Sequence, residues 1–268
     1  MIKVLSNKNE KNFYKKSIKD LFLQEYRKSL TDEIWDFLNG YTDKSVMIVY
    51  VNGNNVVGLA NLIHNFHTLN QFSFEYLIFT TSVVSKEFRS KGVYTLLMFE
   101  VREYLESSNC EFVMAYPNEL ALPIITSPFY RFNVVSNFSL RLVNDFHSIN
   151  SCDIMNFTKL SKSFTKWRFL KCDYYLLKHF DKVLICKDFN GNIDVIEIFN
   201  QNDFDLELFS LPLKSIPDNP TFILPSFRMK DPSKGESIHE QQIVLCCRKN
   251  SMNFESNLDF SNLCWDIM

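Results

Sequence analysis

The 268-residue chain has no marked excess of charge of either sign, which limits the partners that it can bind electrostatically. It carries 29 Lys and Arg against 31 Asp and Glu, so its formal net charge is −2, and its isoelectric point is near 6.2. Nucleic-acid binding through phosphate contacts requires a basic surface. The overall charge therefore does not indicate a nucleic-acid partner, although it leaves a local basic patch open.

The chain also lacks paired cysteine motifs and long apolar segments. Its seven Cys are odd in number and none form a Cys-x-x-Cys spacing, which favours reduced thiols in a cytoplasmic protein. The start of the chain turns polar within a few residues, and no apolar run approaches about 20 residues. We therefore expect neither a signal peptide nor a membrane span.

What the sequence does contain is enough apolar residues for a substantial core. Hydrophobic residues make up 46% of the chain, and a chain of this length forms one large domain or two modest ones. The 26 Phe are spread over both halves. We therefore interpret them first as core residues, and only second as a surface that binds partners. We expect one domain at residues 1–150 and a second at 151–268.

The most informative segment is a strand, a loop and a helix in succession. Residues 76–84 are rich in β-branched and aromatic side chains, which predicts a buried strand, and apolar residues from Val93 onward recur at spacings of three and four, which predicts a helix. Gly92 permits unusual dihedral angles just before the first turn, whose N–H groups point outward. Such a helix start binds phosphate, helped here by Arg89 and Lys91, although an ordinary surface loop can look the same.

The rest of the first half predicts a mixed α/β order around this junction. Thr31 or Asp32 is expected to cap a helix, and Asn52-Gly53-Asn54-Asn55 is typical of a tight hairpin turn. The expected strands are 2–5, 45–51, 56–63, 112–116 and 132–142, and the expected helices are 9–22, 31–38 and 119–126.

This order of elements, with the loop at its centre, resembles the GNAT superfamily of acetyl-CoA-dependent N-acetyltransferases. The cofactor loop of that family reads Gln/Arg-x-x-Gly-x-Gly/Ala, and Arg89, Gly92 and Tyr94 stand at its three fixed positions. Tyr94 departs from the small residue that is usual there. The resemblance covers about residues 45–135, and it implies a mixed sheet flanked by helices and acetyl-CoA as cosubstrate.

The resemblance also implies which residues bind the cofactor. In the family, backbone N–H groups at a bulge in the strand before the loop bind pantetheine, and Val83 and Val84 occupy those positions here. Asn118 resembles the family's Asn that contacts the cofactor arm, and it can also cap the segment that follows it. The loop residues assigned to the diphosphate are Arg89, Ser90, Lys91, Gly92, Val93 and Tyr94.

The residues for proton transfer are less well defined by the resemblance. Transfer of an acyl group to an amine requires a neutral nucleophile and a proton for the leaving thiolate. Glu75 is a candidate base, but the family's glutamate would fall near Ile78 on the opposite strand face, which favours a structural role for Glu75. Thr80 and Ser82, expected on the face of Ile78, would instead hold a water that relays the proton. Tyr130 is the candidate general acid.

Two histidines stand three residues apart near a predicted strand end. His64 and His67 would bind a metal only with further ligands in range, and the sequence indicates none. We interpret both as solvated loop residues and expect no metal site.

The second half repeats a part of the first. Trp35 followed by the hairpin at 46–63 is echoed by Trp167 followed by a hairpin at 183–199, whose turn is Asn190-Gly191-Asn192. No Arg-x-x-Gly loop follows, so we expect a degenerate second GNAT-like domain. The remaining segments are predicted as an irregular connection at 211–225, a polar loop at 228–240 and a strand at 242–248.

The sequence therefore predicts a GNAT-type N-acetyltransferase that transfers acetyl from acetyl-CoA directly to a primary amine of a small molecule. Tandem members that resemble this chain are often associated with surface-polysaccharide pathways, which implies an amino sugar or a nucleotide-linked amino sugar. An aminoglycoside, a polyamine or a peptide amine stays open. The alternatives are a non-catalytic module that keeps the CoA site and a protein that binds partners through aromatic side chains. Neither the acceptor nor the oligomeric state can be read from the sequence.

Overall fold

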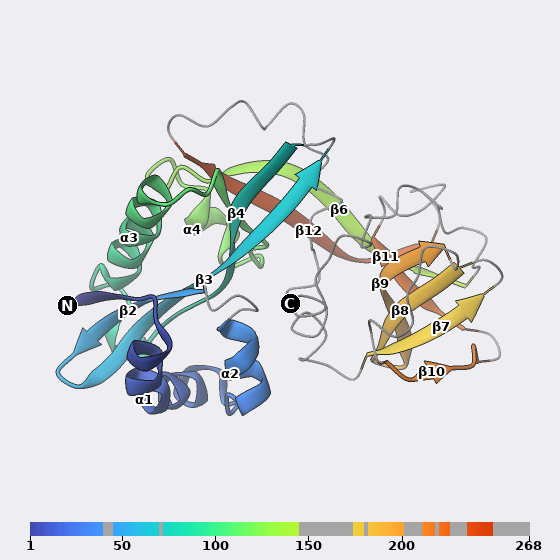
Figure 1. Cartoon of the computed structure of the whole chain (residues 1–268), viewed down its shortest axis with the longest axis horizontal. Helices are drawn as coiled ribbons and strands as arrows, with labels where there is room; N and C mark the ends of the chain where they lie inside the picture. The colour runs from blue at the N-terminus through green and yellow to red at the C-terminus, as the bar shows by residue number, and fades with distance from the viewer. Residues whose placement is uncertain are drawn as a thin grey trace. The chain divides into compact units, whose positions relative to one another are not determined.

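The computed structural model in Figure 1 describes residues 1–39, 45–69, 72–144, 174–179, 182–200, 211–217, 220–225 and 235–248. The contacts within the chain divide it into two units. Residues 1–135 and 243–248 belong to the first unit, and described residues between 136 and 242 belong to the second. The boundary expected at residue 150 lies outside the described residues. Among the helices in these ranges, none is both long and apolar enough to cross a membrane.

The first unit is a mixed sheet with helices on both faces. Its strands follow the order β1-β2-β3-β4-β5-β12, and α3 covers one face while α1 and α2 cover the other (Figure 1). Only the β4–β5 pair in this unit is parallel. The elements are β1 (Ile2–Leu5), α1 (Lys8–Tyr26), α2 (Asp32–Leu38), β2 (Val46–Asn52), β3 (Asn55–Leu69), β4 (Phe72–Val84), a 3-10 turn η1 (Lys86–Phe88), α3 (Val93–Ser107), β5 (Phe112–Ala115), α4 (Leu122–Ile125) and β12 (Glu236–Cys247).

Most of these elements confirm the predictions from the sequence, with shifted ends. Of the two residues expected to cap α2, Thr31 is the cap, and its Oγ1 accepts the Ile34 N–H at 3.3 Å. In the β2–β3 turn, Gly53 takes a φ of +60°. The hairpin strands β3 and β4 are longer than predicted. The expected helix at 119–126 is helical only over Leu122–Ile125.

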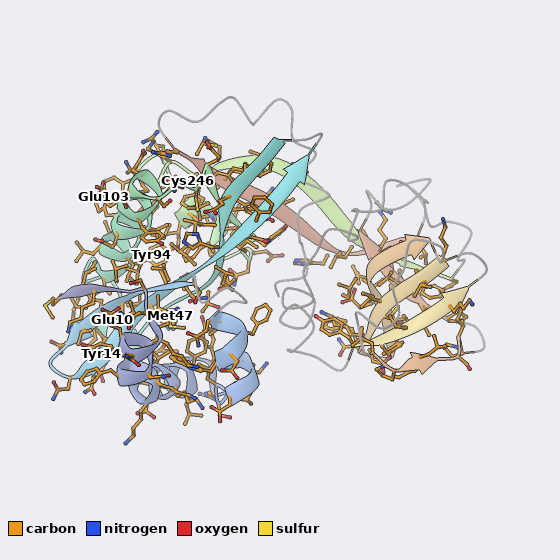
Figure 2. The ribbon with its side chains drawn as sticks, in the orientation of Figure 1. Glu10, Tyr14, Met47, Tyr94, Glu103 and Cys246 are labelled. Atoms are coloured by element: carbon orange, nitrogen blue, oxygen red, sulfur yellow. The ribbon has the colours of Figure 1, made fainter. Side chains whose placement is uncertain are left out.

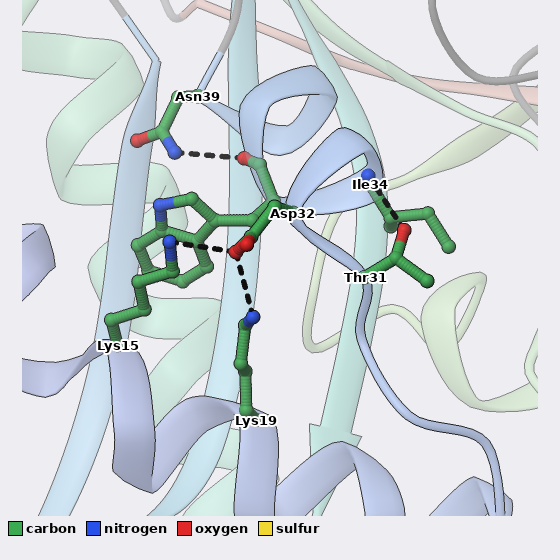
Figure 3. A network of polar contacts seen from close by, with 7 residues as sticks. Lys15, Lys19, Thr31, Asp32, Ile34 and Asn39 are labelled. Atoms are coloured by element: carbon green, nitrogen blue, oxygen red, sulfur yellow. Dashed lines mark hydrogen bonds and ion pairs between the residues drawn. The ribbon is translucent and has the colours of Figure 1, made fainter.

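The two helices on the face opposite α3 are joined by an ion-pair network. Asp32 at the start of α2 accepts from the ammonium groups of Lys15 and Lys19 on α1, at 2.9 and 2.8 Å (Figure 3). The hydrogen bonds from these two lysines lower the pKa of Asp32 to about 2. At the other end of α2, the Asn39 amide donates to the Trp35 carbonyl at 2.7 Å. Because Asp32 is exposed, this network orients α2 more than it stabilises the fold.

Helix α3 packs unusually close to the sheet. Its buried residues include Val93, Leu97 and Val101, which share a core cluster with Ala60 of β3. A side-chain Cβ at Gly58 would lie 2.8 Å from the Val93 Cγ1 atom and 3.2 Å from the Leu97 Cδ1 atom. The absence of a side chain at position 58 therefore sets how closely the first turn of α3 approaches β3.

The second unit repeats the pairing pattern of the first. Its strands are β6 (Asn133–Val143), β7 (Tyr175–His179), β8 (Lys182–Phe189), β9 (Asn192–Asn200), β10 (Leu213–Lys214) and β11 (Phe222–Pro225). The pairs β7–β8 and β8–β9 are antiparallel, β9–β11 is parallel and β11–β6 is antiparallel. The same senses describe β2–β3, β3–β4, β4–β5 and β5–β12 in order. By this pattern, the β8–β9 hairpin corresponds to β3–β4 of the first unit. The repeat in the sequence had aligned the same hairpin with β2–β3.

Three predictions in the second half have mixed outcomes. The hairpin turn is confirmed, with φ of +51° at Asn190 and +81° at Gly191. The prediction of an irregular connection at 211–225 was wrong, because β10 and β11 lie within it; Phe222 and Leu224 are buried and join a core cluster. The late strand is confirmed but begins at Glu236, inside the expected polar loop. The Trp167 segment lies outside the described residues.

Candidate active site

Strands β4 and β5 pair over only a short stretch, and β4 continues beyond the end of β5. Their register joins Leu77 to Val113, Ile78 to Met114 and Phe79 to Ala115, where β5 ends. Strand β4 continues to Val84. The five residues from position 80 to 84 therefore have one edge that is not paired with β5, as the resemblance required.

A β-bulge lies at the start of this open edge. The register between β3 and β4 passes from Asn61 opposite Thr81 to Leu62 opposite Phe79, which makes Thr80 an extra residue in β4. An extra residue reverses the alternation of side chains beyond it. The prediction that Thr80 and Ser82 share a face was therefore wrong.

The side chains of Thr80 and Ser82 instead lie on opposite faces of the sheet. The Thr80 hydroxyl accepts from the Asn61 amide at 2.8 Å, and the same amide donates to the Leu38 carbonyl at the end of α2. The Ser82 side chain lies near the Tyr94 hydroxyl of α3. The helices α2 and α3 lie on different faces (Figure 1), so the bulge presents one hydroxyl to each side of the site.

The main chain of β4 presents two donors to the open edge. The Ser85 N–H donates to the Val57 carbonyl of β3 at 2.9 Å. Because peptide groups alternate along a strand, those of Val83 also face β3, whereas those of Ser82 and Val84 face the other way. Of the two predicted backbone donors, Val84 therefore faces the gap and Val83 does not. Ser82 supplies the second donor.

The carbonyl groups on this edge are already bonded to side chains. The Tyr26 hydroxyl donates to the Ser82 carbonyl at 3.0 Å, and the Arg89 Nε donates to the Val84 carbonyl at 3.1 Å. The edge thus presents N–H donors while its acceptors are satisfied. This arrangement suits a ligand that brings carbonyl oxygens and few donors.

The loop after β4 leads into α3, and the N–H groups of Lys86, Phe88, Arg89 and Lys91 within it are already bonded. Ser90 and Gly92 have φ of +62° and +75°, and the first helical hydrogen bond runs from the Leu96 N–H to the Gly92 carbonyl at 3.0 Å. The N–H groups of the first turn before Leu96 consequently have no helical acceptor. A side chain built at Gly92 would meet nothing within 4 Å. The space in front of these donors is open, which fits a diphosphate.

Arg89 is bound to the protein in a way that the sequence did not predict. Its guanidinium forms an ion pair with the Glu25 carboxylate, and that carboxylate also accepts the Lys86 N–H at 2.8 Å. The Glu25 side chain is 6% exposed. Arg89 therefore stabilises the loop through Glu25, and its charge is largely neutralised. Sequence reasoning missed Glu25 because it lies on α1, far from the motif along the chain.

Tyr94, the departure from the family pattern, does not block the loop. Its side chain packs against the core on the α3 side (Figure 2), with its hydroxyl near Ser82 and its ring edge-on to Tyr130, 5.9 Å between the ring centroids. Burial raises the pKa of Tyr94 to about 12, with an opposing effect of the nearby Ser82 side chain and a further rise from Tyr130. The Tyr130 hydroxyl lies 2.9 Å from the Thr95 hydroxyl. Ser82, Tyr94 and Tyr130 thus come together beside the open edge.

Glu75 lies apart from this group. It is opposite Phe66 in the earlier part of β4, and its carboxylate, the His64 ring and the Cys110 thiol have ligand atoms within 4.8 Å of one another. His64 lies within β3, so its interpretation as a loop residue was wrong. One ring nitrogen of His64 is 2.8 Å from the Tyr104 hydroxyl and the other is 3.5 Å from the Cys110 sulfur. The structure therefore brings two potential ligands, Glu75 and Cys110, to His64, where the sequence indicated none. The side chain of His67 lies outside the described residues.

Two amides complete the survey of the site. The Asn118 Oδ1 accepts the Ala121 N–H at 2.8 Å, so it bonds the turn before α4. The N-cap of α4 itself is Ala121 and not Asn118, and the contact of Asn118 with the cofactor stays a prediction. Asn61 is fully buried, and its Oδ1 has no hydrogen-bond partner in the part of the chain that the structure describes. This acceptor lies beside the bulge, where it can hold a water.

Comparison with known proteins agrees with this geometry. Residues 12–125 match the model of the Acetyltransferase (GNAT) family. The whole chain is similar to a GCN5-related N-acetyltransferase from Kribbella flavida, with a TM-score of 0.60 and 12% identity over 91% of this chain and 71% of that one. Eis1 from Mycobacterium abscessus gives a TM-score of 0.58 and 10% identity, over 92% and 73%. A probable N-acyltransferase from Enterococcus faecalis gives 0.59 and 9%, over 91% and 72%. No curated protein matches the sequence.

The first unit is therefore similar to GNAT acetyltransferases both in the family match and in its fold. The family match lies within the first unit and covers less than half of the chain. The solved structures cover more than nine tenths of this chain, so the similarity in fold extends through both units.

Proposed function

We propose that the first unit binds acetyl-CoA and transfers its acetyl group to a primary amine of a small molecule by direct attack. The observation that supports this most strongly is the alignment of donors: the N–H groups of Ser82 and Val84 lie on the open edge of β4 and lead into the uncapped first turn of α3. Such a row can bind a thioester carbonyl, the amides of pantetheine and a diphosphate in succession.

The residues beside the edge provide for the protons. The amine attacks the carbonyl carbon, the bond from carbon to sulfur breaks, and the departing thiolate takes a proton. Tyr130 was the predicted donor, and Tyr94 is a second candidate because its hydroxyl lies near Ser82 on the open edge. No carboxylate stands at Ile78, so a water near Thr80 and Asn61 would remove the proton of the amine.

The acceptor class is a proposal from the family resemblance alone. An amino sugar or a nucleotide-linked amino sugar is our first choice. Because acetyl-CoA is an intracellular metabolite, the proposed reaction is cytoplasmic. The alternative of a non-catalytic CoA-binding module is supported by the missing carboxylate at Ile78.

The test combines binding and turnover. Calorimetric titration of CoA into wild type and Gly92→Glu measures the site, since an added carboxylate would project into the space in front of the donors. Gly53→Glu is a matched control, because Gly53 also has a positive φ and open space around its Cβ position. We expect CoA binding to be lost only in Gly92→Glu, and wild type to release free thiol with at least one amine. Binding without turnover would support the module, and equal binding by both variants would overturn the site.

A further inference from the structure

Tyr26, the last residue of α1, reaches the open edge of β4 from the side opposite Tyr94. Its hydroxyl donates to the Ser82 carbonyl at 3.0 Å, although 56 residues separate the two in the chain. The residue is 47% exposed. A half-exposed tyrosine whose hydroxyl is bonded at the edge is placed to contact whatever approaches that edge.

The end of α1 is held in place at this edge. Glu25, the residue before Tyr26, accepts the Lys86 N–H and pairs with Arg89. The main chain at Arg27 then turns into the left-handed region and ends the helix, with its N–H donating to the Leu23 carbonyl at 3.0 Å. Tyr26 is therefore fixed between two anchored groups, as a residue that orients a substrate should be.

The hydroxyl of Tyr26 still has acceptor capacity. Its proton is used on the Ser82 carbonyl, and its oxygen lone pairs remain for a donor. The Ser82 N–H faces the same edge and would bind the carbonyl of the acyl group under the proposed function. A donor bound to Tyr26 would consequently lie beside the carbon that is attacked. Tyr94 and Tyr130 are on the α3 side, so the nucleophile and the leaving thiolate would have separate approaches.

We propose that the Tyr26 hydroxyl oxygen accepts a hydrogen bond from one N–H group of the acceptor's amine. Tyr26 thereby selects unsubstituted primary amines. This inference rests on the proposed function. A neutral primary amine has two N–H bonds, of which one donates to Tyr26 and the other carries the proton that leaves. An N-methyl amine has only one, so it cannot do both at once.

Tyr26→Phe tests this assignment, because it removes the hydroxyl and keeps the ring. Tyr14→Phe is the matched control: Tyr14 also lies on α1, and its hydroxyl accepts from the Lys3 ammonium at 2.7 Å, away from the edge. For each protein, CoA affinity is measured by calorimetry, and kcat and KM are measured for a primary amine that wild type acetylates and for its N-methyl derivative.

We expect Tyr26→Phe to bind CoA as wild type does and to lose roughly threefold to tenfold in kcat/KM for the primary amine, the effect of one neutral hydrogen bond. Its preference for the primary over the N-methyl amine should fall by a similar factor, and Tyr14→Phe should match wild type. An unchanged preference, or a loss of CoA affinity that equals the loss of kcat/KM, would overturn the role of Tyr26 alone. Failure of wild type to acetylate any amine would overturn the proposed function and this inference with it.

Discussion

The Tyr94 ring on the first turn of α3 packs edge-on against the Tyr130 ring, with 5.9 Å between the ring centroids, and the Tyr94 hydroxyl lies near Ser82 of β4. A bulky residue at a position where the family has a small one is thus accommodated by turning inward, and its main-chain N–H stays with the other donors of the first turn. Under the proposed function, this arrangement places a protonated hydroxyl near the thiolate that leaves. The residue that departs from the motif is therefore a candidate for the catalysis itself.

Tyr94→Phe should separate catalysis from binding. The variant keeps the ring and its contact with Tyr130 but has no proton to donate, so we expect kcat to fall by roughly 100-fold, the lower range for general acid catalysis. CoA affinity should stay within a factor of two, since the main-chain donors are unchanged. Tyr130→Phe serves as the comparison in steady-state assays. A larger loss in that variant would return the acid role to Tyr130.

The raised pKa of Tyr94 also predicts how stability depends on pH. The pKa lies at about 12 in the folded protein against an ordinary value of 10.0, so the folded state holds this proton more tightly than the unfolded state. The corresponding contribution to stability is complete below pH 10 and is lost as the pH rises toward 12. Urea unfolding at pH 9 and pH 11 should show a smaller decline for Tyr94→Phe than for wild type. Equal declines would contradict the assignment.

Glu25→Gln should destabilise the protein by about 1 kcal/mol, because a nearly buried carboxylate that accepts two hydrogen bonds loses its charge. The measurement is the free energy of urea unfolding. Glu103→Gln on the exposed surface of α3 removes the same charge and should change stability by less than about 0.5 kcal/mol. If the two variants lost the same amount, the link between α1 and the loop would have no energetic role.

Gly58→Ala should cost about 1–3 kcal/mol, since its new Cβ would overlap the Val93 side chain and push α3 from β3. Val93→Ala removes the atom that would collide, so the double variant should lose less than the sum of the two single variants. Denaturant unfolding of all four proteins gives this coupling free energy. Strict additivity would show that the close approach of α3 does not depend on position 58.

The local parts of this protein were readable from the sequence. The strand at 76–84, the helix from Val93, the cap at Thr31 and both Asn-Gly hairpin turns each depend on residues within a few positions of one another. Dihedral preferences and apolar spacing act at that range. The loop before α3 was predictable for the same reason, because a helix start provides its own N–H donors. Its binding of phosphate stays a prediction.

Tertiary structure alone decided which groups meet at the open edge. The bulge at Thr80 turned Ser82 to the α3 side, Glu25 and Tyr26 arrived from the end of α1, and β12 returned from far along the chain to pair with β5. Register and long-range pairing depend on how whole faces of the sheet are buried, and a shift of one residue reverses every side chain beyond it. The composition of a single strand does not indicate such a shift. The N–H donors of the helix start could therefore be predicted, whereas the side chains that meet at the open edge could not.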